Sequence, residues 1–177
     1  MPFKKISIFI LIIIFCACSI SFADEKALLP LEKAEIEKQI EKMKLESENN
    51  RKNGTAFLEV NRQKEGVITL SSGLQYKILV DGKGPHPKPT DTVECHYKGT
   101  LIDETVFDSS YDRGEPAKFQ VNQVIQGWVE ALEIMKTGSI WMLYVPTDLA
   151  YGDRGAGDVI KPGTTLVFKI ELLRIMD

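Results

Sequence analysis

The sequence has few of the side chains on which covalent catalysis and metal chemistry depend. It contains two histidines in 177 residues, and one of them, His86, lies in a proline-rich stretch. A nucleophilic triad needs a serine or cysteine beside a base and an orienting acid, and no motif of that kind is present. Glu94 and His96 would share one face of a strand, but two ligands do not complete a metal site. We therefore expect neither a covalent nucleophile nor a bound metal.

Motifs for cofactors and for nucleic acid are absent as well. Residues 152–157 hold three glycines, but their spacing is not that of a dinucleotide fingerprint, and we expect a surface loop there and no cofactor. The chain has 22 Lys and Arg against 25 Asp and Glu. Two of the lysines and none of the acids fall in residues 1–23, so the remainder carries 20 basic and 25 acidic residues, a net charge of −5. No basic stripe is visible, which argues against a nucleic-acid partner.

Cysteine is scarce, and two of the three cysteines, Cys16 and Cys18, lie near the N-terminus. The residues before them match a lipoprotein cleavage site poorly, so lipidation is the weaker interpretation. If the N-terminal segment that holds these two cysteines is removed on export, Cys95 is the single remaining thiol and no internal disulfide can form. Cys95 either pairs between chains or, as we prefer, is a small apolar residue on a strand.

The first 23 residues have the layout of a secretory signal peptide. Lys4 and Lys5 precede an almost unbroken apolar run at 6–20, and small residues, Ser21 and Ala23, stand before the expected cleavage point. The run is shorter than the ~20 residues that a membrane-spanning helix needs. We predict a cleavable signal peptide at 1–23, with an uncleaved N-terminal anchor as the alternative.

Residues 24–65 differ in composition from the rest of the chain and predict a long helical stalk. They contain one proline, Pro30, no glycine before Gly54, and many glutamates and lysines. A narrow apolar stripe runs along this charged helix, at Leu29, Ile36, Ile40 and Met43. Such a helix is a spacer, half of a dimer, or a solvated helix that frays. The apolar cluster at 56–58 is expected to dock on the following domain.

Alternating apolar and polar residues predict strands throughout the second part of the chain. The expected strands are 74–80, 92–102, 117–121, 139–145 and 164–175. One short helix is expected from Gly127 to Met135, ended by the turn at 136–138. The predicted fold is α+β: a curved antiparallel sheet wrapped on one short helix, preceded by a long N-terminal helix. The organisation is then a signal peptide at 1–23, a stalk at 24–65 and a globular domain at 66–177.

Four short motifs follow one another in the order found in one known family. They are Val106–Ser110 (VFDSS), Val124–Trp128 (VIQGW), Leu149–Gly152 (LAYG) and Thr165–Phe168 (TLVF). The chain from about Gly73 to Ile175 therefore resembles the FKBP-type peptidyl-prolyl cis/trans isomerases. Three further stretches are similar to the macrophage infectivity potentiator group of exported bacterial members: Ser72–Tyr76, Phe119–Ile125 and Tyr144–Pro146.

This resemblance implies an isomerase that assists the folding of extracytoplasmic proteins by twisting the X-Pro amide in an apolar pocket, without a cofactor. Its partners would be proline-containing unfolded or partly folded proteins, and macrocyclic inhibitors of the family would also bind. The implied location is the periplasm, with the outer membrane or cell surface left open. The stalk is shorter than the dimerising region usual in that group, so a homodimer through it also stays open. The competing interpretation is a holdase chaperone, which binds exposed apolar segments of other proteins without catalysing isomerisation.

The resemblance also implies the pocket residues. Trp128 would form the floor, and Tyr97, Phe107 and Phe168 the walls. Tyr151 would donate its hydroxyl to a substrate carbonyl, while Asp108 would be held beside Tyr97 and Arg113. The remaining expected substrate contacts are Val124, Ile125, Val159 and Ile160. Trp141 matches no pocket position and is expected to pack on a strand, and Ala117 stands where many members place another phenylalanine.

Overall fold

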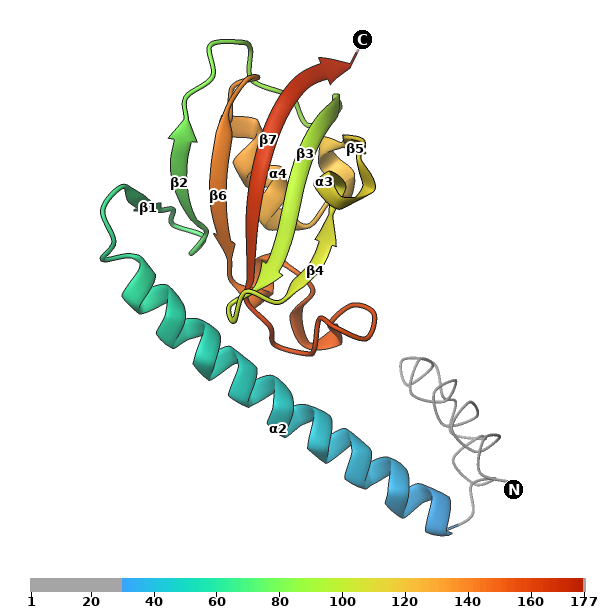
Figure 1. Cartoon of the computed structure of the whole chain (residues 1–177). Helices are drawn as coiled ribbons and strands as arrows, with labels where there is room; N and C mark the ends of the chain where they lie inside the picture. Colours follow the sequence, from blue (N-terminus) through green and yellow to red (C-terminus); the bar gives the residue numbers. More distant parts are fainter. Residues whose placement is uncertain (1–29, 177) are drawn as a thin grey trace. The chain divides into compact units, whose positions relative to one another are not determined.

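A computed structural model describes residues 30–176 of the chain (Figure 1). The predicted signal peptide at 1–23 and Leu29 of the apolar stripe lie outside the described residues. The elements, in chain order, are α2 (Pro30–Asn61), β1 (Val67–Thr69), β2 (Gln75–Val80), β3 (Thr92–Leu101), β4 (Val106–Ser109), α3 (Ser110–Arg113), β5 (Ala117–Gln120), η1 (Val121–Gln123), α4 (Gln126–Ile134), β6 (Ile140–Val145), η2 (Thr147–Leu149), η3 (Gly152–Arg154) and β7 (Leu166–Met176). The elements labelled η are single turns of 3-10 helix.

The strands form one antiparallel sheet in the order β1-β2-β6-β7-β3-β4, and β5 pairs with β3 beside this path. The short helix α4 lies behind the sheet in Figure 1 and covers one of its faces. This arrangement confirms the predicted α+β fold with a preceding long helix. Each of the predicted strands is present, whereas β1, β4 and α3 were not predicted from the sequence. These three elements have only three or four residues, which leaves little room for a periodic pattern, although β5, also of four residues, was predicted.

Alternation along the long strands builds the core. On β7 the apolar residues at 166, 168, 170 and 172 are buried, and the charged Lys169 between them is exposed. On α4 the buried positions are Trp128, Ala131 and Leu132, with Met135 directly after the helix, which is the spacing of one helical face. The core therefore lies between α4 and the inner face of the sheet.

Strand β3 has two different partners along one edge. Its first half pairs with β5, up to Cys95 opposite Ala117, and its second half pairs with β4, from Lys98 opposite Ser109. Tyr97 lies in the gap between them. There the hydroxyl of Ser110 accepts a hydrogen bond from Tyr97 N at 2.7 Å and donates one to Tyr97 O at 3.2 Å. A side chain thus takes the place of a strand and satisfies the backbone at this point.

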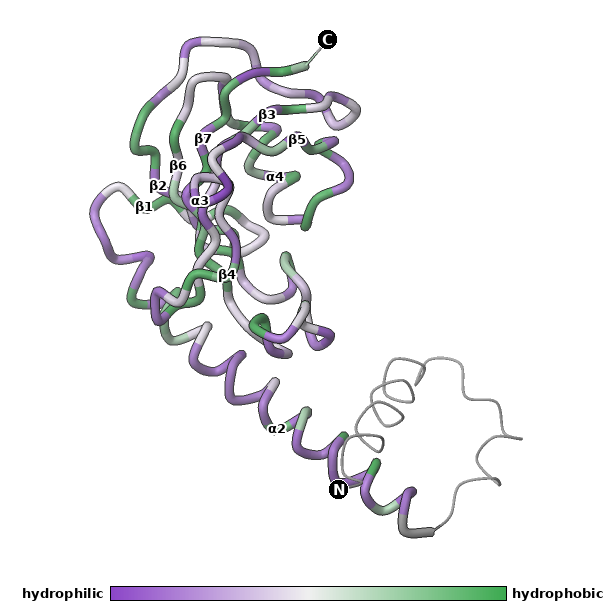
Figure 2. Tube along the Cα trace, turned by 45° about the vertical axis from the view of Figure 1, so that its right-hand side comes forward, coloured by the Kyte–Doolittle hydropathy of each residue, from purple (hydrophilic) through white to green (hydrophobic). Residues whose placement is uncertain are grey.

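Helix α2 is hydrophilic over most of its length, whereas hydrophobic segments concentrate in the strands (Figure 2). Residues 44–177 form one compact unit, and the helix residues before Lys44 belong to another. Within the first of these units the end of α2 packs on the sheet, as expected for the cluster at 56–58. The ring of Phe57 lies 6.0 Å from that of Tyr144, and the buried Asn61 donates to Gln75 Oε1 at 2.9 Å. Across residues 30–176, no helix is both long and apolar enough to span a bilayer.

Candidate active site

A cavity of about 440 Å³ opens between α4, the inner face of the sheet and the loops after β6. Six of its ten lining residues are aromatic. The lining residues are Tyr97, Phe107, Asp108, Phe119, Gln123, Val124, Ile125, Trp128, Tyr151 and Phe168. Asp108 is the one charged residue among them, so the cavity is lined mainly by aromatic rings and has a single acidic edge.

Trp128 lies at the start of α4, where the helix brings its indole under the cavity. The residue is only 3% exposed, and three other aromatic rings contact its indole edge-on. The centroids of Tyr97, Phe119 and Phe168 lie 5.3, 5.4 and 5.2 Å from that of Trp128, with interplanar angles of 83°, 80° and 84°. Edge-to-face contacts of this kind are favourable beyond the apolar area they bury. The indole is therefore a fixed floor.

Phe107 and Phe168 meet in the cavity because Gly99 has no side chain. Gly99 pairs with Phe168 across β3 and β7. A Cβ at Gly99 would lie 2.5 Å from the tip of the Phe107 ring and 3.0 Å from that of Phe168. In the space that the glycine leaves, the two rings pack at 5.6 Å and 87°. The absence of a side chain at Gly99 thus allows Phe107 and Phe168 to form one wall of the cavity.

The polar edge is a closed triangle of Tyr97, Asp108 and Arg113. The hydroxyl of Tyr97 donates to Asp108 and accepts from Arg113 Nη2 at 2.9 Å, while Arg113 Nη1 donates to Asp108. Burial acts to raise the pKa of Asp108, but the hydrogen bonds from Tyr97 and Arg113 outweigh it and hold this pKa below its usual value. Asp108 therefore stays ionised at neutral pH with its charge compensated.

Tyr151 differs from Tyr97, because within residues 30–176 its hydroxyl has no hydrogen-bond partner. The side chain is 40% exposed and lines the cavity. Burial, and secondly the negative charge of Asp108, raises the pKa of Tyr151. The phenol thus remains protonated at neutral pH and presents an unused donor.

The sequence model of FKBP-type peptidyl-prolyl cis-trans isomerases matches residues 84–173, which is half of the chain. The chain belongs to this family. A second model, of the domain amino terminal to FKBP-type peptidyl-prolyl isomerases, matches residues 21–78.

Individual relatives agree with this assignment. The chain is 54% identical over 129 residues to the outer membrane protein MIP of Legionella longbeachae, covering 73% of this chain and 55% of the relative. It is 56% identical over 123 residues to the FKBP-type 22 kDa peptidyl-prolyl cis-trans isomerase of Escherichia coli K12, covering 70% and 60%. The crystal structure of FkpA from Escherichia coli superposes with a TM-score of 0.79 at 40% identity, covering 89% of this chain and 74% of that one. The match to these two curated relatives thus spans 55–60% of their length.

The structure brings together most of the residues that the FKBP resemblance assigned to the pocket. Eight of them line the cavity: Tyr97, Phe107, Asp108, Val124, Ile125, Trp128, Tyr151 and Phe168. Arg113 does not line it but binds two residues that do. Val159 and Ile160 are not among the lining residues. Val159 is 44% exposed on the loop after η3, and Ile160 is turned into the core with 7% exposure.

Two lining residues, Phe119 and Gln123, were missed. Phe119 follows Ala117 by two positions on β5 and therefore points to the same face of the strand. Its ring supplies an aromatic wall to a cavity in which Ala117 contributes none. The one sequence signal that could have identified Phe119 is the two-residue periodicity of the strand, which places it on the same face as Ala117. Gln123 ends a short 3-10 turn, for which the sequence carries no comparable pattern.

Neither a cluster of metal ligands nor a reactive thiol is found in residues 30–176. Residues 30–176 contain no group of three or more His, Cys, Asp or Glu side chains placed to hold a metal ion. Cys95 is fully buried on β3, and this burial, with a smaller effect of Glu94, raises the pKa of its thiol to about 12. A thiol of that kind is not a nucleophile at neutral pH.

Proposed function

We propose that this chain catalyses the cis/trans isomerisation of X-Pro bonds in extracytoplasmic proteins and so assists their folding. The observation that carries the proposal is the aromatic cavity floored by Trp128, with its one carboxylate compensated by Tyr97 and Arg113. Family membership and the names of the relatives support the same activity.

The reaction needs an environment rather than a reactive group. Rotation about the prolyl amide must break its resonance, which sets a barrier of ~18–20 kcal/mol and a time of tens of seconds. At the twisted state the carbonyl is less polar and the proline nitrogen more basic. An apolar cavity therefore disfavours the planar ground state more than the twisted state. Lowering the barrier by ~5–6 kcal/mol would accelerate rotation by about 10⁴-fold.

Each cavity group has a part in this scheme. The proline ring lies on the Trp128 indole, between the rings of Phe107, Phe168 and Phe119. The free phenol of Tyr151 donates to a substrate carbonyl and fixes the chain on one side of the rotating bond. Because Asp108 is compensated within its triangle, it adds a polar edge without a strong field across the apolar floor.

A protease-coupled assay on a short proline peptide tests the proposal. Truncating Phe107 to Ala removes a cavity wall and should lower kcat/KM by at least tenfold. Phe57→Ala removes the same side chain from α2, outside the cavity, and is the matched control. If Phe107→Ala and wild type give equal rates while both bind unfolded protein, the catalytic assignment fails and the chain is a holdase.

We infer further that the mature chain begins after Ala23 and acts in the periplasm or at the outer surface of the cell. The leader pattern at 1–23 supports export, and the Legionella relative is named an outer membrane protein. Mass spectrometry of the fractionated protein tests this. Retention of residues 1–23 in the cytoplasm would contradict it.

The stalk at 24–65 and the domain at 66–177 remain our proposed division of the mature chain. We propose that the apolar stripe at Ile36, Ile40 and Met43 pairs two copies into a homodimer. Sedimentation of the mature protein tests this, and a single species of monomer mass would overturn it. Binding of a macrocyclic FKBP inhibitor is also proposed, and a titration that leaves tryptophan fluorescence unchanged in a Trp141→Phe background, where Trp128 is the one indole, would contradict it.

A further inference from the structure

Tyr151 lies on an irregular segment between two single turns of 3-10 helix, η2 and η3. The backbone bonds that precede it run from Leu149 N to Pro146 O at 2.9 Å and from Ala150 N to Thr147 O at 3.0 Å. Ala150 has φ −118° and ψ −116°, outside helical and strand conformations. Local secondary structure alone therefore does not fix the direction of the Tyr151 ring.

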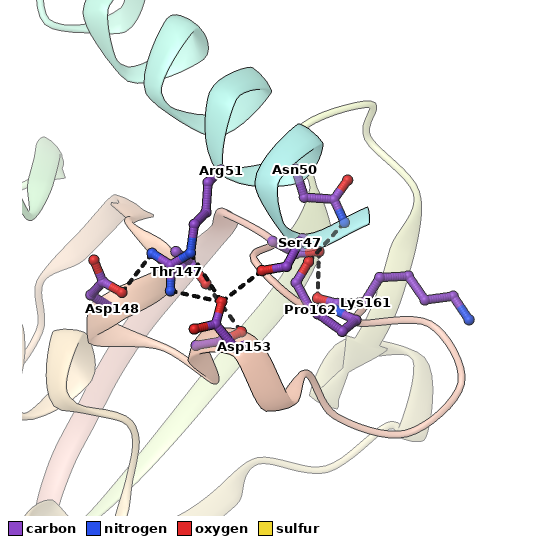
Figure 3. Close-up of polar contacts among 10 residues, drawn as sticks. Ser47, Asn50, Arg51, Thr147, Asp148, Asp153, Lys161 and Pro162 are labelled. Atoms are coloured by element: carbon purple, nitrogen blue, oxygen red, sulfur yellow. Dashed lines mark hydrogen bonds and ion pairs between the residues drawn. The ribbon is translucent and has the colours of Figure 1, made fainter. Parts of the chain in front are cut away.

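One side chain of α2 spans this segment from end to end (Figure 3). The guanidinium of Arg51 donates from Nη1 to Asp148 Oδ1 at 2.7 Å and from Nε to Asp153 Oδ1 at 3.0 Å. Asp148 precedes Tyr151 by three residues and Asp153 follows it by two. Because the guanidinium is planar and rigid, it fixes the separation of the two carboxylates that bracket Tyr151.

The preceding turn of α2 holds the same region. The buried hydroxyl of Ser47 donates to Asp153 Oδ1 at 2.6 Å, so this carboxylate oxygen receives both Ser47 and Arg51. Asn50 Nδ2 donates to the carbonyl of Pro162 at 2.8 Å, on the loop that follows η3. Figure 3 shows these contacts converging from one face of the helix.

The loop and the Tyr151 segment are also tied to each other. Gly163 N donates to the carbonyl of Gly152, the residue after Tyr151, at 2.9 Å. A Cβ on Gly163 would lie 2.3 Å from the carbonyl oxygen of Ser47, so the backbone of α2 is in close contact here. The helix, the loop and the Tyr151 segment therefore form one connected structure.

We propose that Arg51, assisted by Ser47, is a positioning residue that aims the Tyr151 phenol into the cavity. This inference rests on the proposed isomerase function and assigns part of that function to the N-terminal helix. The side chains of Asp148 and Asp153 are 75% and 70% exposed, and such ion pairs add little to stability. The bridge between them instead restricts the position of Tyr151, so we expect its loss to lower the catalytic rate rather than the stability of the fold.

The first experiment compares Arg51→Ala with Arg62→Ala in the full-length mature protein. Arg62 lies directly after the last residue of the same helix and pairs with Glu59 three residues earlier, so its removal costs an exposed ion pair away from the cavity. Arg51→Ala should lower kcat/KM on a proline peptide by about two- to tenfold, the range for one misdirected hydrogen bond. Arg62→Ala should match wild type, and the urea midpoints of all three proteins should agree closely.

The second experiment asks whether Arg51 acts through Tyr151. Tyr151→Phe removes the hydroxyl, and adding Arg51→Ala in that background should cause little further loss. A merely structural role would give the same loss in both backgrounds, and that result would overturn the inference. Arg51→Lys keeps the charge but cannot bridge two carboxylates, so its rate should lie nearer that of Arg51→Ala than that of wild type.

If Arg51→Ala unfolds, the pair Asp148→Ala and Asp153→Ala removes both acceptors of the bridge while leaving α2 intact, and the same loss of rate is expected. The proposed function and the positioning role of Arg51 can be refuted separately. A wild-type rate equal to the uncatalysed one refutes the proposed function. An active wild type whose Arg51→Ala and Arg62→Ala variants are equally active refutes the positioning role alone.

Discussion

Tyr97 donates its phenolic hydrogen to the carboxylate of Asp108, which joins the long strand β3 to the short strand β4 beside the cavity. The bond fixes the hydroxyl of one wall residue and compensates the one charge in the lining. It also makes Asp108 a group whose ionisation is coupled to folding.

Asp108→Asn should destabilise the protein in a pH-dependent manner. The pKa of Asp108 is lowered in the folded state, so its ionised form stabilises the fold above its unfolded-state pKa of about 3.9. This contribution is lost as pH falls through the lower folded-state pKa. Urea unfolding should therefore show a gap between wild type and variant near pH 7 that narrows in acid. Asp112→Asn on α3 is the matched control, and a gap independent of pH would contradict the linkage.

Gly99→Ala should damage the cavity wall. The added methyl would lie 2.5 Å from the Phe107 ring, so the rings of Phe107 and Phe168 must move apart. We expect a loss of about 1–3 kcal/mol in the free energy of unfolding, together with reduced kcat/KM. In a Phe107→Leu background the ring tip is gone, and Gly99→Ala should then cost less. Equal costs in the two backgrounds would show that Phe107 is not the group displaced.

Gly54→Ala should destabilise the protein, contrary to helix propensity. Replacing a glycine by alanine inside a helix ordinarily stabilises it by about 1 kcal/mol. Here the new Cβ would lie 2.1 Å from Thr165 Oγ1, at the place where α2 meets the start of β7. Urea midpoints should fall for Gly54→Ala and recover only in part when Thr165→Ala is added, because the Cβ at position 165 would still lie 2.9 Å from the new methyl group. A midpoint raised by the single substitution would refute the close contact.

Cys95 should be unreactive until the protein unfolds. The thiol is buried on β3 and its pKa is raised to about 12, so almost no thiolate exists at neutral pH. Labelling of the mature chain with a thiol reagent should be slow in buffer and fast in urea. Rapid labelling in buffer, at a rate independent of urea, would show that this strand is accessible.

The long elements were predictable from the sequence because their patterns are strong and local. Strand β7 alternates over eleven residues, and Trp141 was expected to pack on a strand. In the structure Trp141 stacks on Tyr76 of the neighbouring strand at 4.4 Å. Short strands carry a weaker signal: β5, with four residues, was predicted, whereas β1 and β4, with three and four, were found only in the structure.

The candidate site, like the fold, was only partly predictable from the sequence. The pocket residues assigned from inside the four FKBP motifs line the cavity, as does Tyr97 outside them, whereas Val159 and Ile160 do not. Arg51 had no sequence signal, because its partners Asp148 and Asp153 are 97 and 102 positions away. On a charged helix such an arginine is indistinguishable from its solvent-facing neighbours.

The hydroxyl of Ser110 closes the edge of β3 between its two partner strands, and this has a practical consequence for engineering. Along this edge β3 pairs with β5 before Tyr97 and with β4 after it, while β7 pairs with β3 along its whole length on the other edge. The connection at 114–116 begins with Gly114, around whose Cα no heavy atom would meet an added Cβ within 4 Å. Residues inserted there should therefore be accommodated without displacing either strand pairing of β3 or the Tyr97 wall between them.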